Sequence, residues 1–161
     1  MRGTYYIVRL RNTAGIPLEF PKGLFRLPAI DAAVNLARDQ LETFILQALP
    51  LGASYHIFVR GGADPEAYAA PDGIADELGP VRIRKLADGN KYGEATESAG
   101  LRGPFSNADL PQLRAAYVRS VFLRGWQRGE IELLEQRPSA EEASGTRVVD
   151  LILYVGWTNA Q

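Results

Sequence analysis

The sequence predicts one α/β (α+β) domain in which a mixed β-sheet carries two long helices on one face. Two segments, residues 29–49 and 109–123, place apolar residues at every third or fourth position, which is typical of amphipathic helices. Runs rich in β-forming residues surround them, so the order is β-α-β-(insert)-α-β-β. Two helices on one face of such a sheet would bury both apolar stripes in a single core. The length fits one domain spanning 1–161, with an insert at about 65–105.

The first half of the chain is predicted to form a strand, a helix and a second strand. Thr4–Arg11 alternates in polarity and is rich in β-forming residues, which indicates a strand. Ile16–Phe25 is apolar but contains two prolines, so we expect an irregular or edge strand at most. Ala29–Leu49 has helical spacing, and Pro50 ends the helix. Ser54–Arg60 then has the composition of a buried strand.

The second half contains the insert, a helix and two strands. Within the insert, Val81–Arg84 alternates in polarity, and we expect it to pair with the segment around Tyr92–Thr96 through the Asp88-Gly89 turn. The remaining elements are a helix from an Asp109 N-cap to about Leu123, a short strand over Glu130–Glu135 and a strong strand over Arg147–Trp157.

Composition argues against several classes of function. The net charge of −1 is not that of a domain that holds nucleic acid by bulk electrostatics. The absence of cysteine excludes thiolate metal sites and thiol nucleophiles, and the single histidine, His56, excludes a histidine-rich metal site. No nucleophile-elbow pattern is present. We therefore predict no catalytic residues, no metal and no cofactor. A binding module is favoured over an enzyme, with a pocket framed by the long insert as the enzymatic alternative.

Two side chains are candidates for binding a ligand. Asp64 follows the strand that ends in Gly61-Gly62, where the glycines let a ligand approach the backbone. Arg114 lies in the second turn of the second helix, and its guanidinium offers a fork for a carboxylate. Together the two charges would suit a zwitterion. The alternative is a simple Asp64–Arg114 salt bridge beside an ordinary helix.

The same segments resemble the signatures of the OmpA-like family, the peptidoglycan-binding domain found at the C-terminus of OmpA and MotB proteins. Gly61-Gly62-Ala63-Asp64 is similar to the Gly-His-Thr-Asp strand end of that family. The second signature, Asn-x-x-Leu-Ser-x-x-Arg-Ala-x-x-Val, is matched in spacing by Asn107, Leu110, Arg114, Ala115 and Val118. The resemblance covers roughly Ile16–Trp157.

This resemblance implies a two-layer β-α-β-α-β-β sandwich that binds the diaminopimelate of the peptidoglycan stem peptide. By position, Asp64 and Arg114 would hold the ligand, and Asn107 would be a supporting polar contact. The resemblance also implies a periplasmic protein of the cell envelope if the domain belongs to a longer anchored or secreted chain. A complete chain would instead be cytoplasmic. No stretch approaches the roughly 20 apolar residues of a membrane helix, so we expect no membrane span in this chain.

The chain also departs from the family pattern. Gly62, Ala63 and Pro111 replace the usual His, Thr and Ser, and the connection between the two signatures is much longer than in the family. These departures favour a second hypothesis, in which the fold is reused as an assembly or scaffold module that does not bind peptidoglycan. The insert would then bind a partner protein or a second copy of the chain. Its candidate contacts are Tyr68, Ile83, Tyr92 and Phe105.

Overall fold

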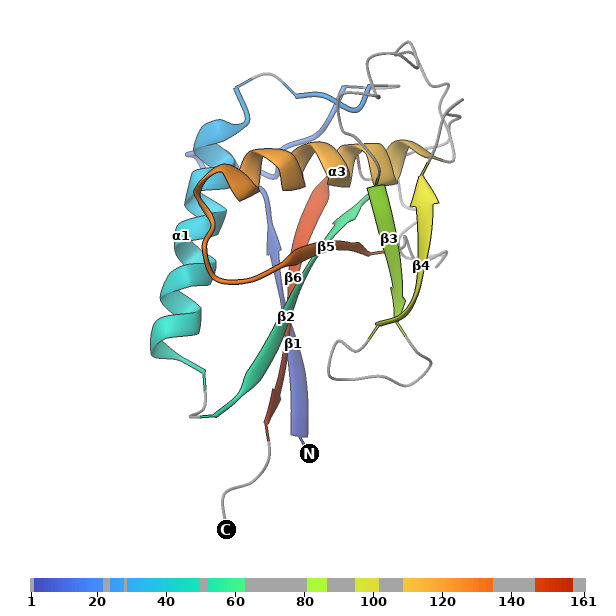
Figure 1. Ribbon diagram of the computed structural model, residues 1–161. Helices are drawn as coiled ribbons and strands as arrows, with labels where there is room; N and C mark the ends of the chain where they lie inside the picture. Colours follow the sequence, from blue (N-terminus) through green and yellow to red (C-terminus); the bar gives the residue numbers. More distant parts are fainter. Residues whose placement is uncertain are drawn as a thin grey trace.

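The protein has a mixed α+β fold in which two helices pack on a β-sheet (Figure 1). The structure is a computed structural model that describes residues 2–21, 24–27, 29–49, 52–62, 81–86, 95–101, 109–134 and 147–157. In chain order the elements are β1 (Arg2–Arg9), α1 (Asp31–Gln47), β2 (Ser54–Gly61), β3 (Val81–Leu86), β4 (Ala95–Leu101), α3 (Leu110–Phe122), the short 3-10 helix η3 (Leu123–Gly125), β5 (Ile131–Leu134) and β6 (Val149–Trp157). Among the helices of these ranges, none has the length and apolar character needed to cross a membrane.

The six strands form one mixed sheet in the order β1-β6-β2-β5-β3-β4. The last strand of the chain, β6, lies between β1 and β2 and runs antiparallel to both. β5 is parallel to β2 on one side and to β3 on the other. The sheet is therefore assembled from strands far apart in the sequence, and β1 and β4 form its two edges.

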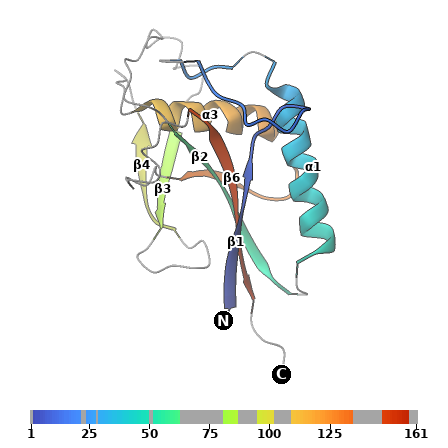
Figure 2. The same cartoon turned by 180° about the vertical axis from the view of Figure 1, so that it is seen from behind.

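Both helices lie on the same face of the sheet, as predicted (Figures 1 and 2). The β6 side chains alternate, and Val149, Leu151, Leu153 and Val155 join the helices in the main core. The opposite face carries a smaller cluster of buried residues formed by Phe58, Leu134, Ile152 and Tyr154. This alternation follows from the two-residue period of a strand.

The first helix begins two residues later than the apolar pattern predicts. Ala29 has a φ of 56°, which lies in the left-handed region and is incompatible with a helical turn. α1 therefore begins at Asp31, whose carboxylate is favourable near the positive end of the helix dipole. Its buried stripe, which faces the sheet, consists of Ala33, Val34, Ala37 and Leu41.

The second helix follows the predicted range with one correction. Asp109 occupies the N-cap position, but its side chain makes no capping hydrogen bond and its backbone is already in the right-handed helical region. A proline in the first turn supplies the helical φ without losing an intrahelical hydrogen bond.

The insert contributes two strands to the sheet. β3 and β4 pair antiparallel, so Val81–Arg84 does pair with a later segment of the insert. The predicted partner around Tyr92–Thr96 is wrong, because Val81–Arg84 pairs with residues 98–101 of β4. The predicted Asp88-Gly89 turn lies outside the described residues. Because β3 also pairs with β5, the two described strands of the insert extend the sheet.

Gly61 marks the place where the end of β2 contacts the first turn of α3. A Cβ atom at this position would overlap the carbonyl oxygen of Pro111. Gly61 is itself buried, so the two backbones meet inside the protein. Only glycine permits such a close approach, and this contact fixes where α3 crosses the sheet.

We expect Gly61→Ala to lower the free energy of unfolding by about 1–3 kcal/mol, because the added methyl group must push β2 away from α3. Gly125→Ala is the control, since a Cβ there would meet only the end of the flexible Arg38 side chain, at 3.0 Å. Urea denaturation of both variants measures the effect. A wild-type midpoint for Gly61→Ala would contradict the close approach.

Candidate functional site

Arg114 of α3 is the centre of the predicted site, and its side chain is 0% exposed. Nε donates to the carbonyl of Leu24 at 2.8 Å, Nη1 to that of Gly62 at 2.9 Å and Nη2 to that of Pro21 at 3.1 Å. The guanidinium also lies 5.6 Å from the ring centroid of Phe20. One side chain thus joins the helix, the end of β2 and the segment that precedes α1.

A second arginine ties this segment to the start of β6. Nε of Arg147 donates to the carbonyl of Phe20 at 2.9 Å, and the amide of Phe20 donates to the carbonyl of Arg147 at 2.7 Å. Arg147 also forms an ion pair with Glu19 at 3.6 Å. The irregular chain between β1 and α1 is therefore held by two cations, with Phe20 buried between them and the core.

The structure places only part of the predicted ligand site. Asp64 and Asn107 lie outside the described residues, so their assignment as ligand contacts stays a prediction. Gly62, two residues before Asp64, does contact Arg114, so the strand end and the helix start of the two signatures lie together. However, a guanidinium with no exposed surface differs from the solvent-reachable side chain that we expect of a ligand contact.

The buried guanidinium is suited to holding backbone carbonyls in place. Its planar fork supplies fixed donors, and charge-assisted hydrogen bonds offset the cost of removing the cation from water. Within the described ranges, no group of three or more His, Cys, Asp or Glu side chains is arranged to hold a metal ion. His56 is exposed on the face opposite the helices, where its ring lies 6.5 Å from that of Phe58.

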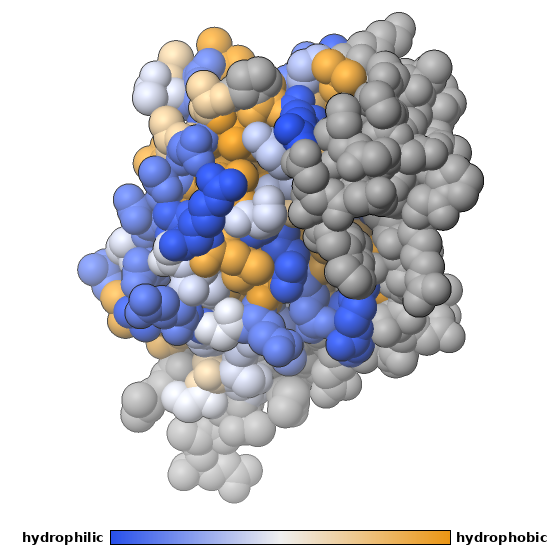
Figure 3. Space-filling model, turned by 45° about the horizontal axis from the view of Figure 1, so that its top comes forward, coloured by the Kyte–Doolittle hydropathy of each residue, from blue (hydrophilic) through white to orange (hydrophobic). Residues whose placement is uncertain are grey.

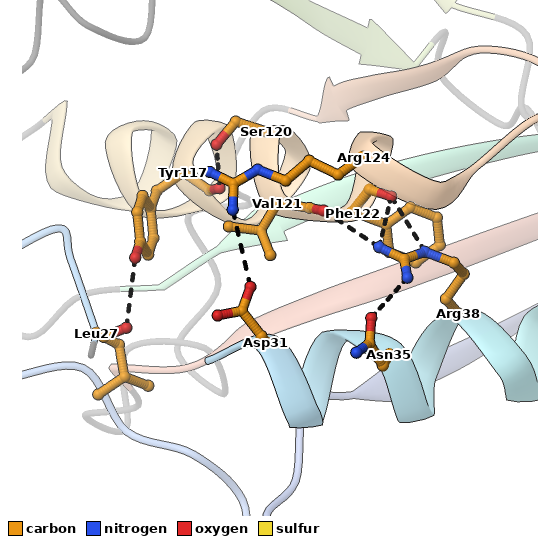
Figure 4. Close-up of polar contacts among 9 residues, drawn as sticks. All are labelled: Leu27, Asp31, Asn35, Arg38, Tyr117, Ser120, Val121, Phe122 and Arg124. Atoms are coloured by element: carbon orange, nitrogen blue, oxygen red, sulfur yellow. Dashed lines mark hydrogen bonds and ion pairs between the residues drawn. The ribbon is translucent and has the colours of Figure 1, made fainter. Parts of the chain in front are cut away.

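The contact between the helices is also made by cations and carbonyls (Figure 4). Arg38 of α1 donates to the carbonyls of Val121 and Phe122, and its guanidinium lies 5.3 Å from the Phe122 ring centroid. These carbonyls belong to the last turn of α3, where the helix dipole favours a cation. Arg38 therefore caps α3 from the neighbouring helix.

The free edge of β1 is a second candidate surface, which the sequence analysis did not identify. Tyr5, Tyr6 and Ile7 are 57%, 43% and 49% exposed. Among the described strands, β1 pairs only with β6. Over its coloured part, the face seen in Figure 3 shows many hydrophilic side chains with several hydrophobic groups between them. Three consecutive large apolar residues on a sheet edge are therefore a notable local exposure.

The outer side of β1 carries backbone groups that no described strand pairs with. The amide of Leu10 donates to the carbonyl of Val149 at 3.3 Å, on the β6 side. Because the hydrogen-bonding direction alternates along an antiparallel strand, the amide and carbonyl groups of Tyr5, Ile7 and Arg9 point to the outer side. The edge therefore offers a row of donors and acceptors beside exposed apolar side chains.

Side chains along this edge are already ordered. Arg9 binds Asp150 through Nε at 2.8 Å and Nη2 at 3.1 Å. The hydrogen bond to Asp150 raises the pKa of Arg9 above its ordinary value, although burial opposes the shift, so the guanidinium stays protonated. The Tyr5 ring lies 5.6 Å from that of Tyr154, and the Tyr6 ring lies 4.4 Å from that of Phe44.

A comparison with models of protein families gave no match, and no curated protein matches the sequence.

We expect Arg114→Lys to lower the free energy of unfolding by about 3–5 kcal/mol, because one ammonium cannot replace a fork bonded to three separated carbonyls, and buried acceptors would lose their donors. The control is Arg124→Lys, where the side chain is 72% exposed and its ion pair with Asp31 spans 3.8 Å. Thermal and urea unfolding measure both variants. Equal stability for the two variants would contradict the structural role of Arg114.

Proposed function

We propose that this domain is a non-catalytic binding module that assembles with another protein chain by adding an extended segment to the free edge of β1. The observation that carries this proposal is the combination of outward-pointing backbone groups and exposed apolar side chains at Tyr5, Tyr6 and Ile7. Strand addition to a sheet edge is a recurrent mode of peptide recognition, in which the backbone supplies affinity and alternate side chains supply specificity.

Among the described residues, β1 lacks several of the features that usually prevent strand pairing, although it carries two charged residues, Arg2 and Arg9. Natural edge strands are commonly protected by proline, lysine, bulges or short length. β1 is eight residues long, contains neither proline nor lysine, and pairs with β6 in an unbroken register from Arg2 to Arg9. A long regular edge of this kind is suited to receiving another strand.

The energetics fit a specific but modest interaction. Each added backbone hydrogen bond contributes roughly 0.5–1.5 kcal/mol net. Tyr5 and Tyr6 already pack on Tyr154 and Phe44, so docking immobilises little additional side-chain freedom. A single extended segment is therefore expected to bind with a Kd of roughly micromolar to millimolar strength.

The proposal extends the assembly hypothesis to a surface other than the insert. The described part of the insert forms the opposite sheet edge through β4, and Ile83 on β3 is half-buried. The other candidate contact residues of the insert, Tyr68, Tyr92 and Phe105, lie outside the described residues. The order of the elements and the shared face of both helices support a divergent OmpA-like sandwich reused for assembly.

Peptidoglycan binding in the periplasm is the second candidate function. The contact between Arg114 and the Gly62 carbonyl favours it, because the two segments that resemble the family signatures lie together there. In this function Asp64 would bind the ammonium of diaminopimelate and Arg114 its carboxylate. Binding would require the buried guanidinium to exchange backbone carbonyls for the ligand, which makes this the less favoured candidate.

For strand addition, we expect amide exchange observed by NMR to separate the two sides of β1. Amides that face β6 (Thr4, Tyr6 and Val8) should be protected in the free domain, whereas those of Tyr5, Ile7 and Arg9 should exchange quickly and gain protection when a soluble peptide of alternating valine and threonine is added. The matched control is the same peptide N-methylated at alternate residues, which keeps the side chains but cannot pair. Unchanged exchange at the outer amides with millimolar peptide would refute docking at β1.

For peptidoglycan, we expect a diaminopimelate-containing muropeptide to shift the Gly61 and Gly62 amides and the Arg114 Nε–H signal, with saturation in the micromolar to millimolar range. The same peptide with lysine in place of diaminopimelate lacks the second carboxylate and is the control. If neither ligand shifts these signals at millimolar concentration, the peptidoglycan candidate is lost.

A further inference from the structure

A small pocket lies beside the outer side of β1, at its carboxyl end. Its volume is about 320 Å³, and it is lined by Ile7, Val8, Arg9, Arg11 and Gln40. Consecutive residues of the strand line it, with Ile7 and Arg9 on one face of the sheet and Val8 on the other. The pocket therefore follows the edge where an added strand would lie.

The two arginines that line this pocket differ in the hydrogen bonds and ion pairs that they already form. Two nitrogens of the Arg9 guanidinium are bonded to Asp150, which neutralises much of its charge. Arg11 is exposed, and its Nη1 donates to the Gly15 carbonyl at 2.9 Å, without an ion pair among the described residues. Gln40, on the exposed side of α1, also lines the pocket. Of the two arginines that line the pocket, Arg11 is therefore the one whose guanidinium has no carboxylate partner among the described residues.

We propose that this pocket receives a carboxylate side chain of the docking segment, so that the partner at β1 is an extended acidic strand. This inference rests on the proposed strand addition. The carboxylate would bind the Arg11 guanidinium, with the Gln40 amide as a further donor, while Ile7 and Val8 contact the aliphatic part of the same side chain.

The charge of the edge argues for an acidic partner rather than a second copy of this chain. Residues 1–18 contain Arg2, Arg9 and Arg11 and no Asp or Glu, and because Arg9 is paired with Asp150, the basic character of this edge comes from Arg2 and Arg11. A second copy paired through its own β1 would bring the same basic segment to the basic edge. Like charges placed across an interface disfavour that pairing, and opposite charges favour encounter with an acidic strand.

The test compares two capped heptapeptides, Thr-Val-Thr-Val-Glu-Val-Thr and the same sequence with Gln in place of Glu, by calorimetric titration at low salt. We expect the Glu peptide to bind about tenfold more tightly to the wild-type domain. Arg11→Gln should reduce this preference to about twofold or less, because the variant loses more affinity for the Glu peptide than for the Gln peptide. Added salt should also reduce the preference, because the pocket is open to solvent. Arg124→Gln removes an exposed cation far from β1 in the sequence and should keep the full preference.

The outcomes separate this inference from the proposed function. Equal binding of both peptides, with protection of the outer β1 amides, would overturn the acidic preference and leave strand addition standing. If neither peptide binds or protects those amides, both proposals fail. Sedimentation that shows a stable dimer abolished by Ile7→Pro would identify a second copy as the occupant and overturn the acidic partner. Proline at this position removes an outward amide rather than a bond to β6.

Discussion

The buried guanidinium of Arg114 connects α3 to two segments that no helix or strand pairing would hold beside it: the chain before α1 and the end of β2. It reaches from α3 to the carbonyls of Pro21 and Leu24 and to that of Gly62. A cation removed from water is costly unless it is fully hydrogen-bonded, so its site tolerates little rearrangement. The segment before α1 and the end of β2 are consequently fixed relative to α3, and the close contact of Gly61 with Pro111 depends on that placement.

The same chemistry recurs elsewhere in the molecule. Arg38, Arg119 and Arg147 each donate to backbone carbonyls, at the end of α3, at β5 and in the segment before α1. These arginines act as structural ties between separate elements of the fold. A count of arginines in this chain is therefore a poor measure of its basic binding surface. Arg11 differs because its position places the cation in an open pocket at the sheet edge.

The main core of the domain and the proposed binding edge lie in different parts of the sheet. The main core lies between the sheet and the two helices, whereas β1 has only one strand neighbour among the described residues and exposes its aromatic side chains. β6 is buried along nearly its whole length, so it provides a rigid support on which β1 is displayed. An added strand would extend an existing sheet without disturbing the core, which is a physical reason for a module to bind at an edge.

The sequence by itself determined the helices, most strands and their buried faces, because the apolar spacing of Ala29–Leu49 and Arg147–Trp157 is set by local periodicity. The sequence also indicated that Arg114, in the signature that begins at Asn107, has a particular role. Only the tertiary structure decided that β6 lies between β1 and β2 and that β1 lies at the edge. Strand order depends on long-range pairing, and the alternating pattern of these strands is compatible with more than one order. The partners of Arg114 were decided in the same way. A guanidinium can bind a ligand carboxylate or a backbone carbonyl with the same donors, and the fold brought carbonyls to it.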